Sequence, residues 1–314
     1  MTIGNSVTNI EKNAFKNCKS LMKVKYGSSL KFIGESAFRY CYKLKNVELS
    51  DSVEEIGKDA FCSCTALQHV KLSKNLKAIP EECFQCCHGL IDISIPDSVE
   101  EIGDYAFGHC ESLTEAYISA NVKKMGIAPF ATCNAIEKLV IDKNNSYYDS
   151  RDNSNAIIET ATNRIIEIGP NGIIPDGVRI IGEECMASDS CDCQEVQNYV
   201  IKVPKSVKVI EKGAFKNCRA KRVEIPRTVK IIRKYTFSDC IINELILPDT
   251  IKAVGFRAFD SSQIKKLTFK AKKFAIKGNL FGDNGVAYIR HLYCVRGSYA
   301  IKEAKKYKIP YSFI

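Results

Sequence analysis

The sequence repeats one short pattern along most of its length, a phenylalanine followed three positions later by a cysteine. The first six of these phenylalanines follow one another at intervals of 23 residues, and later members of the series at intervals of 22. A fixed period between about 20 and 50 residues is typical of a solenoid, in which each repeat stacks on its neighbours. We therefore expect one elongated array rather than the two compact domains that 314 residues would usually suggest. The series comprises Phe15, Phe38, Phe61, Phe84, Phe107 and Phe130, then Phe215, Phe237, Phe259 and Phe281.

Residues 51–72 illustrate what one repeat encodes. Residues 51–53 predict a turn leading to a buried valine, and residues 54–57 end in a glycine that we expect to adopt a special backbone angle. Residues 58–64 predict a short helical or 3-10 turn that buries the phenylalanine and the cysteine. Residues 67–72 alternate apolar and polar, which predicts a strand with Lys71 facing solvent. One such strand per rung, always in the same direction, predicts a long parallel sheet on one face.

The cysteines follow the same register. Eight of the fifteen occupy one repeat position. Rungs stacked about 4.8 Å apart would bring these thiols into a buried column, where a cysteine behaves as a small hydrophobe with a weak S–H donor. Disulfide pairing between some rungs is the alternative that the pattern leaves open. The column comprises Cys18, Cys41, Cys64, Cys87, Cys110, Cys133, Cys218 and Cys240.

Residues 142–176 interrupt the array. Within them, two apolar stretches at 156–159 and 164–168 flank a polar turn, which predicts a hairpin that protrudes from the sheet end of one rung. The chain then ends in a predicted strand at 291–295 and a helix that Ser298 would cap and that would continue through Lys308. Its inner side would carry Ala300, Ile301, Ala304 and Tyr307. We therefore predict a solenoid of about eleven rungs over residues 1–290, with a hairpin insertion near 142–176, and a C-terminal strand–helix cap over residues 291–314.

The charge is distributed unevenly. Residues 1–200 contain 20 Lys and Arg against 28 Asp and Glu, whereas residues 201–314 contain 26 against 8. We expect an acidic first part and a basic second part. The N-terminus has neither a basic start nor an apolar stretch, so no signal peptide is visible. Ile3 stands where a repeat strand would end, which suggests a fragment of a longer protein from which a signal could have been removed. No apolar run is long enough for a membrane span.

Catalytic motifs are not found. The four histidines fall in different repeats, and neither a nucleophile elbow nor a phosphate-binding loop is present. Cys185, Cys191 and Cys193 could form a zinc loop or a local disulfide, but their spacing is not that of a structural zinc site. Residues 142–153 resemble a calcium loop without its glycine and its glutamate. We expect no enzymatic activity, no cofactor and no metal site.

The outward side of the predicted sheet is the first candidate binding surface. Its regular charged columns are interrupted by Tyr117 and Val140, close to the insertion with Tyr147 and Tyr148. Exposed aromatic residues beside a protrusion are typical of a protein-binding site. Together with Lys71, these residues form the predicted partner site. The alternative is that mixed charges simply keep the sheet hydrated.

The basic second part is the second candidate. Its cations would attract a polyanion such as a glycosaminoglycan, although lysine is also common on surfaces without any partner. No nucleic-acid-binding motif accompanies them, so nucleic acid is a poor candidate. The predicted polyanion-binding residues are Arg222, Lys265, Lys266, Lys270, Lys272 and Lys273.

The repeat LxxVxLPxxVxxIGxxAFxxC resembles that of the BspA-like leucine-rich repeat family, the Treponema pallidum type. Residues 95–110 and 225–229 carry the resemblance most clearly, and it extends over almost the whole chain. The insertion is similar to one found in family members from gut bacteria. The resemblance implies an α/β leucine-rich-repeat solenoid, curved and right-handed, with the parallel sheet on its concave face and short turns and small strands on the convex side. It also implies a secreted or surface-displayed bacterial protein with no catalytic residues.

Two hypotheses of function follow. The first is a non-enzymatic scaffold for binding and adhesion at the cell surface, with a protein or glycan partner on a host surface or in the extracellular matrix. The second is a structural spacer that presents another domain. Binding of a polyanion through the basic part of the chain is a further alternative.

Overall fold

A computed structural model describes residues 1–186, 200–282 and 288–314. The chain divides into two compact units. The N-terminal unit comprises residues 1–161 and 166–172, and the C-terminal unit comprises residues 162–165 and 173–314. Each unit is a stack of rungs built from short parallel strands.

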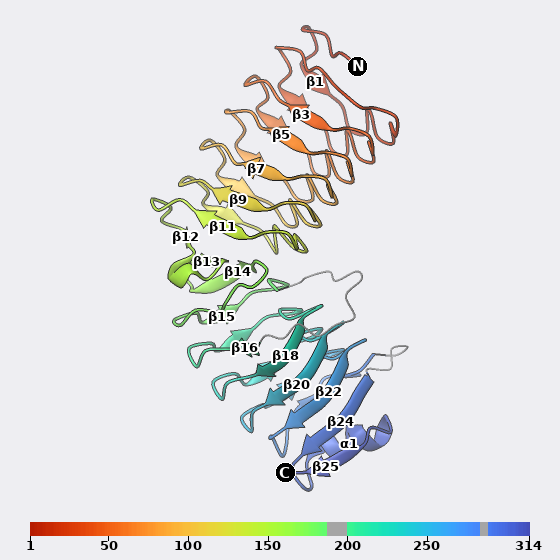
Figure 1. Ribbon diagram of the computed structural model, residues 1–314, viewed down its shortest axis with the longest axis vertical. Coiled ribbons are helices and arrows are strands. Elements are labelled where there is room, and N and C mark those ends of the chain that lie inside the picture. Colours follow the sequence, from red (N-terminus) through yellow and green to blue (C-terminus); the bar gives the residue numbers. More distant parts are fainter. Residues whose placement is uncertain (187–199, 283–287) are drawn as a thin grey trace. The chain divides into compact units, whose positions relative to one another are not determined.

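Two sets of strands run through the N-terminal unit (Figure 1). One strand of each set belongs to a rung, and each pairs in parallel with the equivalent strand of a neighbouring rung, as the repeat predicts. The sheet-face strands are β3 (Asn46–Glu48), β5 (His69–Lys71), β7 (Asp92–Ser94), β9 (Glu115–Ile118) and β11 (Lys138–Ile141). The short strands are β1 (Asn9–Ile10), β2 (Phe32–Ile33), β4 (Glu55–Ile56), β6 (Ala78–Ile79), β8 (Glu101–Ile102) and β10 (Lys124–Met125).

Between these strands the backbone forms consecutive tight turns rather than the helical or 3-10 turn that we expected. Around Phe38, the residues two positions before and after it, Ser36 and Tyr40, have φ of 55° and 65°. Positive φ angles interrupt any helix. They let alternate amides point out of the rung, so that the N–H groups of Phe38 and Tyr40 donate to Ala60 and Cys62 of the next rung at 2.8 and 3.0 Å. The turn face is therefore a hydrogen-bonded ladder like the sheet.

Phenylalanine rings stack along the inside of each unit. Between Phe38 and Phe130, successive ring centroids lie 5.2–5.6 Å apart and the ring planes differ by 1–6°. Phe215 and Phe237 continue the same arrangement at 5.2 Å within the C-terminal unit. Because the backbone ladders fix the rung spacing, each ring fills the space that its two neighbours leave.

The cysteine column is buried beside the rings, except for exposed Cys18, and its members are free thiols. Six of the eight thiols donate to the carbonyl oxygen of the phenylalanine one rung earlier, for example from Cys64 to Phe38 and from Cys110 to Phe84, both at 3.3 Å. Ser262 occupies the same position in a later rung and donates to Phe237. The carbonyl groups of Phe38 and Phe84 also accept the amides of Cys41 and Cys87 within their own turns, at 3.1 and 3.2 Å, so the thiol adds a second hydrogen bond to each carbonyl oxygen.

The repeat glycine is required for a different reason than we expected. The φ angles of Gly57 and Gly103 are not in the left-handed region. A Cβ atom at either position would lie 2.4 Å from a backbone nitrogen of the preceding rung, that of Glu35 or Glu81. The absence of a side chain permits the rungs to approach here.

The insertion contains β12 (Tyr148–Asp149), the 3-10 turn η1 (Arg151–Asn153), β13 (Ala156–Glu159) and β14 (Arg164–Ile168). β13 and β14 are neighbours in one sheet, which confirms the hairpin. The expectation that it protrudes is wrong, because Ile157 and Ile166 are buried and belong to the hydrophobic core of the N-terminal unit. Apolar residues on successive positions of both strands drive this burial.

Polar side chains of the insertion replace the backbone partners that the interrupted repeat no longer supplies. The buried carboxyl group of Glu167 accepts a hydrogen bond from the amide of Phe130 at 3.1 Å. Asn155 Oδ1 likewise accepts from the amide of Leu139, on β11, at 2.8 Å. Burial raises the pKa of Glu167 well above its usual range.

The C-terminal unit repeats the two-strand rung with one long sheet (Figure 1). Its neighbouring sheet strands pair in parallel. The long sheet contains β16 (Val200–Lys202), β18 (Arg219–Glu224), β20 (Ile241–Leu247), β22 (Gln263–Phe269), β24 (Tyr288–Cys294) and β25 (Tyr311–Phe313). The short strands are β15 (Ile180–Ile181), β17 (Val209–Ile210), β19 (Ile231–Ile232), β21 (Ala253–Val254) and β23 (Ala275–Ile276).

Helix α1 (Tyr299–Lys306) lies between β24 and β25. Ala300 and Ala304 face inward and are buried, as the sequence predicts, but the helix ends two residues before the expected Lys308. Ser298 is the N-cap residue, without a hydrogen bond from its side chain to the helix. Among the described residues, no helix is both long enough and apolar enough to cross a membrane.

Candidate functional site

The outward residues of the N-terminal sheet form the two columns that the repeat predicts. The register aligns Asn46 with His69 and Glu48 with Lys71, and further along it aligns Ser94 with Tyr117. Lys71 is exposed at the end of β5. This surface is therefore a regular grid of polar side chains, in which apolar side chains are the exception.

Tyr117 and Val140 are that exception. They lie opposite each other on β9 and β11, and the Tyr117 side chain remains 37% exposed. Its hydroxyl donates to Asp142, whose other carboxylate oxygen accepts the amide of Asn144 at 2.8 Å. The hydrogen bond to Asp142 raises the pKa of Tyr117 and lowers the pKa of Asp142. The ring is thus held in place on the surface before any partner arrives.

The sequence indicates Asp142 only as part of an incomplete calcium loop. In the structure its carboxylate already binds Tyr117 and its own turn. Its position one residue after β11, in the column next to Val140, is the signal that could have revealed this role.

The two insertion tyrosines differ in exposure. Tyr147 is 43% exposed, whereas Tyr148 is only 3% exposed. The Tyr148 hydroxyl accepts a hydrogen bond from the amide of Met125 at 2.8 Å. The expectation that Tyr148 belongs to an exposed partner site is therefore wrong. Tyr147 lies within electrostatic reach of Lys123, beside the short strands, and no hydrogen bond or ring contact links it to Tyr117.

The predicted basic residues of the C-terminal unit do not form one patch. Arg222, on β18, is half-buried and forms ion pairs with Glu224 and Glu244, both at 3.1 Å. Its charge is thus offset by two carboxylates, which argues against its predicted role in binding a polyanion.

The five predicted lysines are all exposed, but they lie in two places. Lys265 and Lys266 are on β22, where Lys266 aligns with Glu244 and His291 on the adjacent strands. Lys270, Lys272 and Lys273 follow β22, in the turn that leads to the short strand β23. The sheet face and this turn are separate candidate sites for an anion.

Among the described residues, no group of three or more His, Cys, Asp or Glu side chains could hold a metal ion. Burial raises the pKa of Cys64, Cys87 and Cys110 well above that of a free thiol, so these thiols are poor nucleophiles. Cys191 and Cys193, part of the proposed zinc or disulfide loop, lie outside the described residues.

Several solved structures resemble this one. A leucine-rich cell surface protein from Faecalibacterium prausnitzii is 27% identical, with a TM-score of 0.74, and the alignment covers 90% of this chain and 79% of the other. A leucine-rich repeat protein from Eubacterium ventriosum shares 17% identity and a TM-score of 0.63, over 94% and 74% of the two chains. The pneumococcal vaccine antigen PcpA shares 17% and 0.53, over 100% and 78%. The last two likenesses concern the fold alone.

None of the curated proteins matches the chain. A family model, by contrast, matches most of it. Six copies of the BspA type leucine-rich repeat region align with residues 1–107, 31–160 and 181–293. These segments contain the stacked phenylalanines, the thiol column and the paired strands of both units. The chain therefore belongs to the family of BspA-type leucine-rich repeat proteins.

Proposed function

We propose that this chain is a binding scaffold at the cell surface, and that it holds a protein partner on the sheet face of its N-terminal unit. One observation carries the proposal: exposed Tyr117 lies beside half-buried Val140 in a grid that is otherwise polar. Such a pair gains from being covered, because burial removes apolar surface from water. Tyrosine is among the residues that dominate binding energy at protein interfaces.

The hydrogen bond between Tyr117 and Asp142 supports this use of the ring. A side chain that is already fixed loses less conformational entropy on binding. Charged residues on the same face, such as Lys71, Asp92 and Glu115, would form the polar rim that surrounds the apolar centre of an interface. The similar Faecalibacterium protein is described as a cell surface protein, which supports a location at the cell surface.

The proposal is tested with an array of purified extracellular matrix proteins and secreted proteins. The chain should bind at least one of them, and Tyr117→Ala combined with Val140→Lys should weaken that binding about 30-fold, as loss of a 2 kcal/mol hot spot implies. Glu48→Ala, a change on the outward side of β3 in the same unit, is the control and should alter affinity less than threefold. Equal binding by the double variant and the wild type would refute the proposal, as would failure to bind any protein of the array.

A further inference from the structure

The residue immediately before each short strand forms a column along one edge of each unit, which we call the corner column. In the N-terminal unit its charges alternate in sign. Lys31 pairs with Glu54 at 3.3 Å, and Lys123 pairs with Glu100 at 3.0 Å across adjacent rungs. The backbone amide of each of these four residues also donates to the backbone carbonyl of the column member one rung earlier. The full series is Thr8, Lys31, Glu54, Lys77, Glu100 and Lys123.

In the C-terminal unit, the members of the corner column that precede β15, β17, β19 and β21 are all cations. The series Arg179, Lys208, Lys230 and Lys252 precedes β15, β17, β19 and β21. All four side chains are exposed. The amide of Lys208 donates to the carbonyl of Arg179 at 2.9 Å, and that of Lys252 donates to the carbonyl of Lys230 at 2.8 Å, so the residues stand on successive rungs. None of the four has a carboxylate partner among the described residues.

This difference between the units has an electrostatic consequence. Alternating charges attract one another from rung to rung, whereas four like charges about 4.8 Å apart repel. The same backbone position can therefore carry either pattern, and the fold does not require an all-basic column. A row of unpaired cations raises the local concentration of anions, which makes the C-terminal corner column a candidate for binding.

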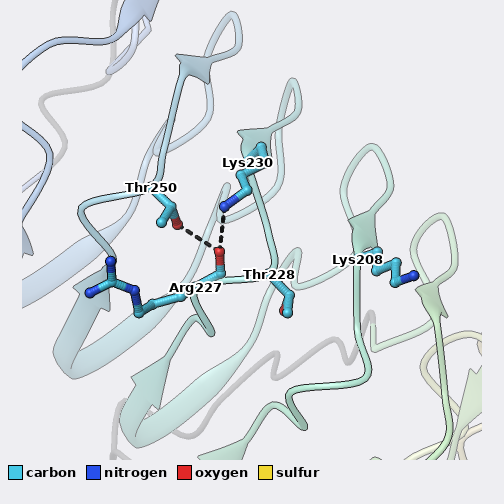
Figure 2. Close-up of a pocket in the computed structure, with 5 residues that line it drawn as sticks. All are labelled: Lys208, Arg227, Thr228, Lys230 and Thr250. Carbon is cyan, nitrogen blue, oxygen red and sulfur yellow. Dashed lines mark hydrogen bonds between the residues drawn. The ribbon is translucent and has the colours of Figure 1, made fainter.

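A shallow depression borders this column (Figure 2). Lys208, Arg227, Thr228, Lys230 and Thr250 line it. The hydroxyl of Thr250 and the ammonium group of Lys230 both donate to the carbonyl oxygen of Arg227, each at 2.8 Å, and the hydroxyl of Thr228 donates to Val207 at 2.5 Å. A hydroxyl that already donates retains its lone pairs. The two threonines can therefore accept hydrogen bonds from a ligand.

We propose that the corner column of the C-terminal unit binds a linear sulfated polysaccharide. The cations repeat in one direction only, along the stacking axis, and so match a polymer with anionic groups along its length. Lysine ammonium groups offer point charges for sulfate, and the threonine hydroxyls accept from sugar hydroxyl groups, which a lipid headgroup surface or a phosphate backbone would not supply in the same measure. This site lies on a different unit from the proposed protein-binding face.

Nucleic acid is less well matched. Single strands bind in basic grooves by stacking bases on aromatic side chains, and no aromatic residue lines the depression. Ile231, an exposed apolar residue next to the column, offers no face for stacking. A flat anionic membrane would contact the whole corner but would leave the recessed threonine hydroxyls unused.

Immobilised heparin is the probe. If about four cations release counterions, the affinity should fall roughly 100-fold between 50 and 200 mM salt, by the relation that holds for other dense polyanions. Lys230→Glu places an acidic side chain between Lys208 and Lys252, as Glu100 stands between Lys77 and Lys123 in the N-terminal unit. This change should weaken binding at least 10-fold while the thermal unfolding temperature is kept or rises. Lys265→Glu, the same charge change on the sheet face, is the matched control and should change affinity less than threefold.

A second arm tests the column by gain of function. Glu54→Lys combined with Glu100→Lys makes the N-terminal corner column basic from Lys31 to Lys123, and this pair should restore heparin binding to the Lys230→Glu variant. Three results would overturn the proposal: no retention of the wild type, an equal loss with Lys265→Glu, or tighter binding to a DNA duplex or to phosphatidylserine vesicles than to heparin at the same salt concentration.

Discussion

Phe107→Ala should be the most damaging single change in the ring column. The side chain is fully buried, and its ring lies 5.6 Å from that of Phe84 and 5.2 Å from that of Phe130. Removal of a buried phenylalanine side chain costs about 3–5 kcal/mol, and more where the surroundings cannot collapse. The amides of Phe84 and Phe107 donate to Ala106 and Pro129 of the next rungs at 2.8 Å. These bonds fix the spacing of the rungs, so the surroundings cannot collapse into the cavity. We therefore expect Phe107→Ala to lower the free energy of unfolding by about 4–5 kcal/mol.

Phe15→Ala is the internal control for this prediction. Phe15 is only half-buried and stacks on one ring, that of Phe38, at 5.2 Å. Because Phe15 is less buried than Phe107 and contacts one ring instead of two, its replacement by alanine should lower the free energy of unfolding by only about 1–2 kcal/mol. The sequence contains no tryptophan, so urea unfolding is best followed by far-ultraviolet circular dichroism, with hydrogen exchange to locate the weakened rungs. If Phe107→Ala proved no more destabilising than Phe15→Ala, the account of the column would be wrong.

Three further predictions concern the inner columns and the insertion. Alkylation at pH 8 followed by mass spectrometry should label exposed Cys18 first and buried Cys110 only on unfolding, because burial raises the pKa of the latter; early labelling of Cys110 would contradict the burial of the column. Gly103→Ala should destabilise by more than about 1 kcal/mol, although Gly→Ala usually stabilises, because the Cβ would lie 2.4 Å from the Glu81 nitrogen; a higher melting temperature would count against this contact. The folded pKa of Glu167 is raised, so the stability from its bound proton is present below the unfolded pKa of about 4.3 and is lost as pH rises toward the folded pKa. Between pH 5 and pH 8, the free energy of unfolding of Glu167→Gln should therefore rise relative to that of the wild type. If the two free energies changed with pH in parallel, this effect would be excluded.

The repeat made most of the fold predictable. A period of 23 residues assigns every phenylalanine and cysteine of the series to one position, and a strand that alternates leaves only one register in which its apolar residues face inward. Lys71 and Tyr117 could therefore be placed on the surface without coordinates. The confirmed hairpin followed from the same kind of pattern at a smaller scale.

What the sequence did not predict depends on contacts between distant residues. The burial of Tyr148 follows from its hydrogen bond to Met125, 23 residues earlier, and nothing in the local sequence requires it. Arg222 looked available because its partner Glu244 lies on the next rung. The close approach of backbone at Gly57 likewise involves residues one repeat apart, so a single repeat offered only the more familiar explanation of a special backbone angle.

The central claim is that inward columns determine stability while the residues that interrupt the outward pattern determine binding. One paired measurement tests it most directly: urea unfolding and binding to the partner identified by the array, for the same samples of the Tyr117→Ala, Val140→Lys double variant. We predict a free energy of unfolding within about 0.5 kcal/mol of the wild type, as for most surface changes, together with a 30-fold loss of affinity. Binding that survives the double change, or that is lost only in proportion to stability, would contradict the claim.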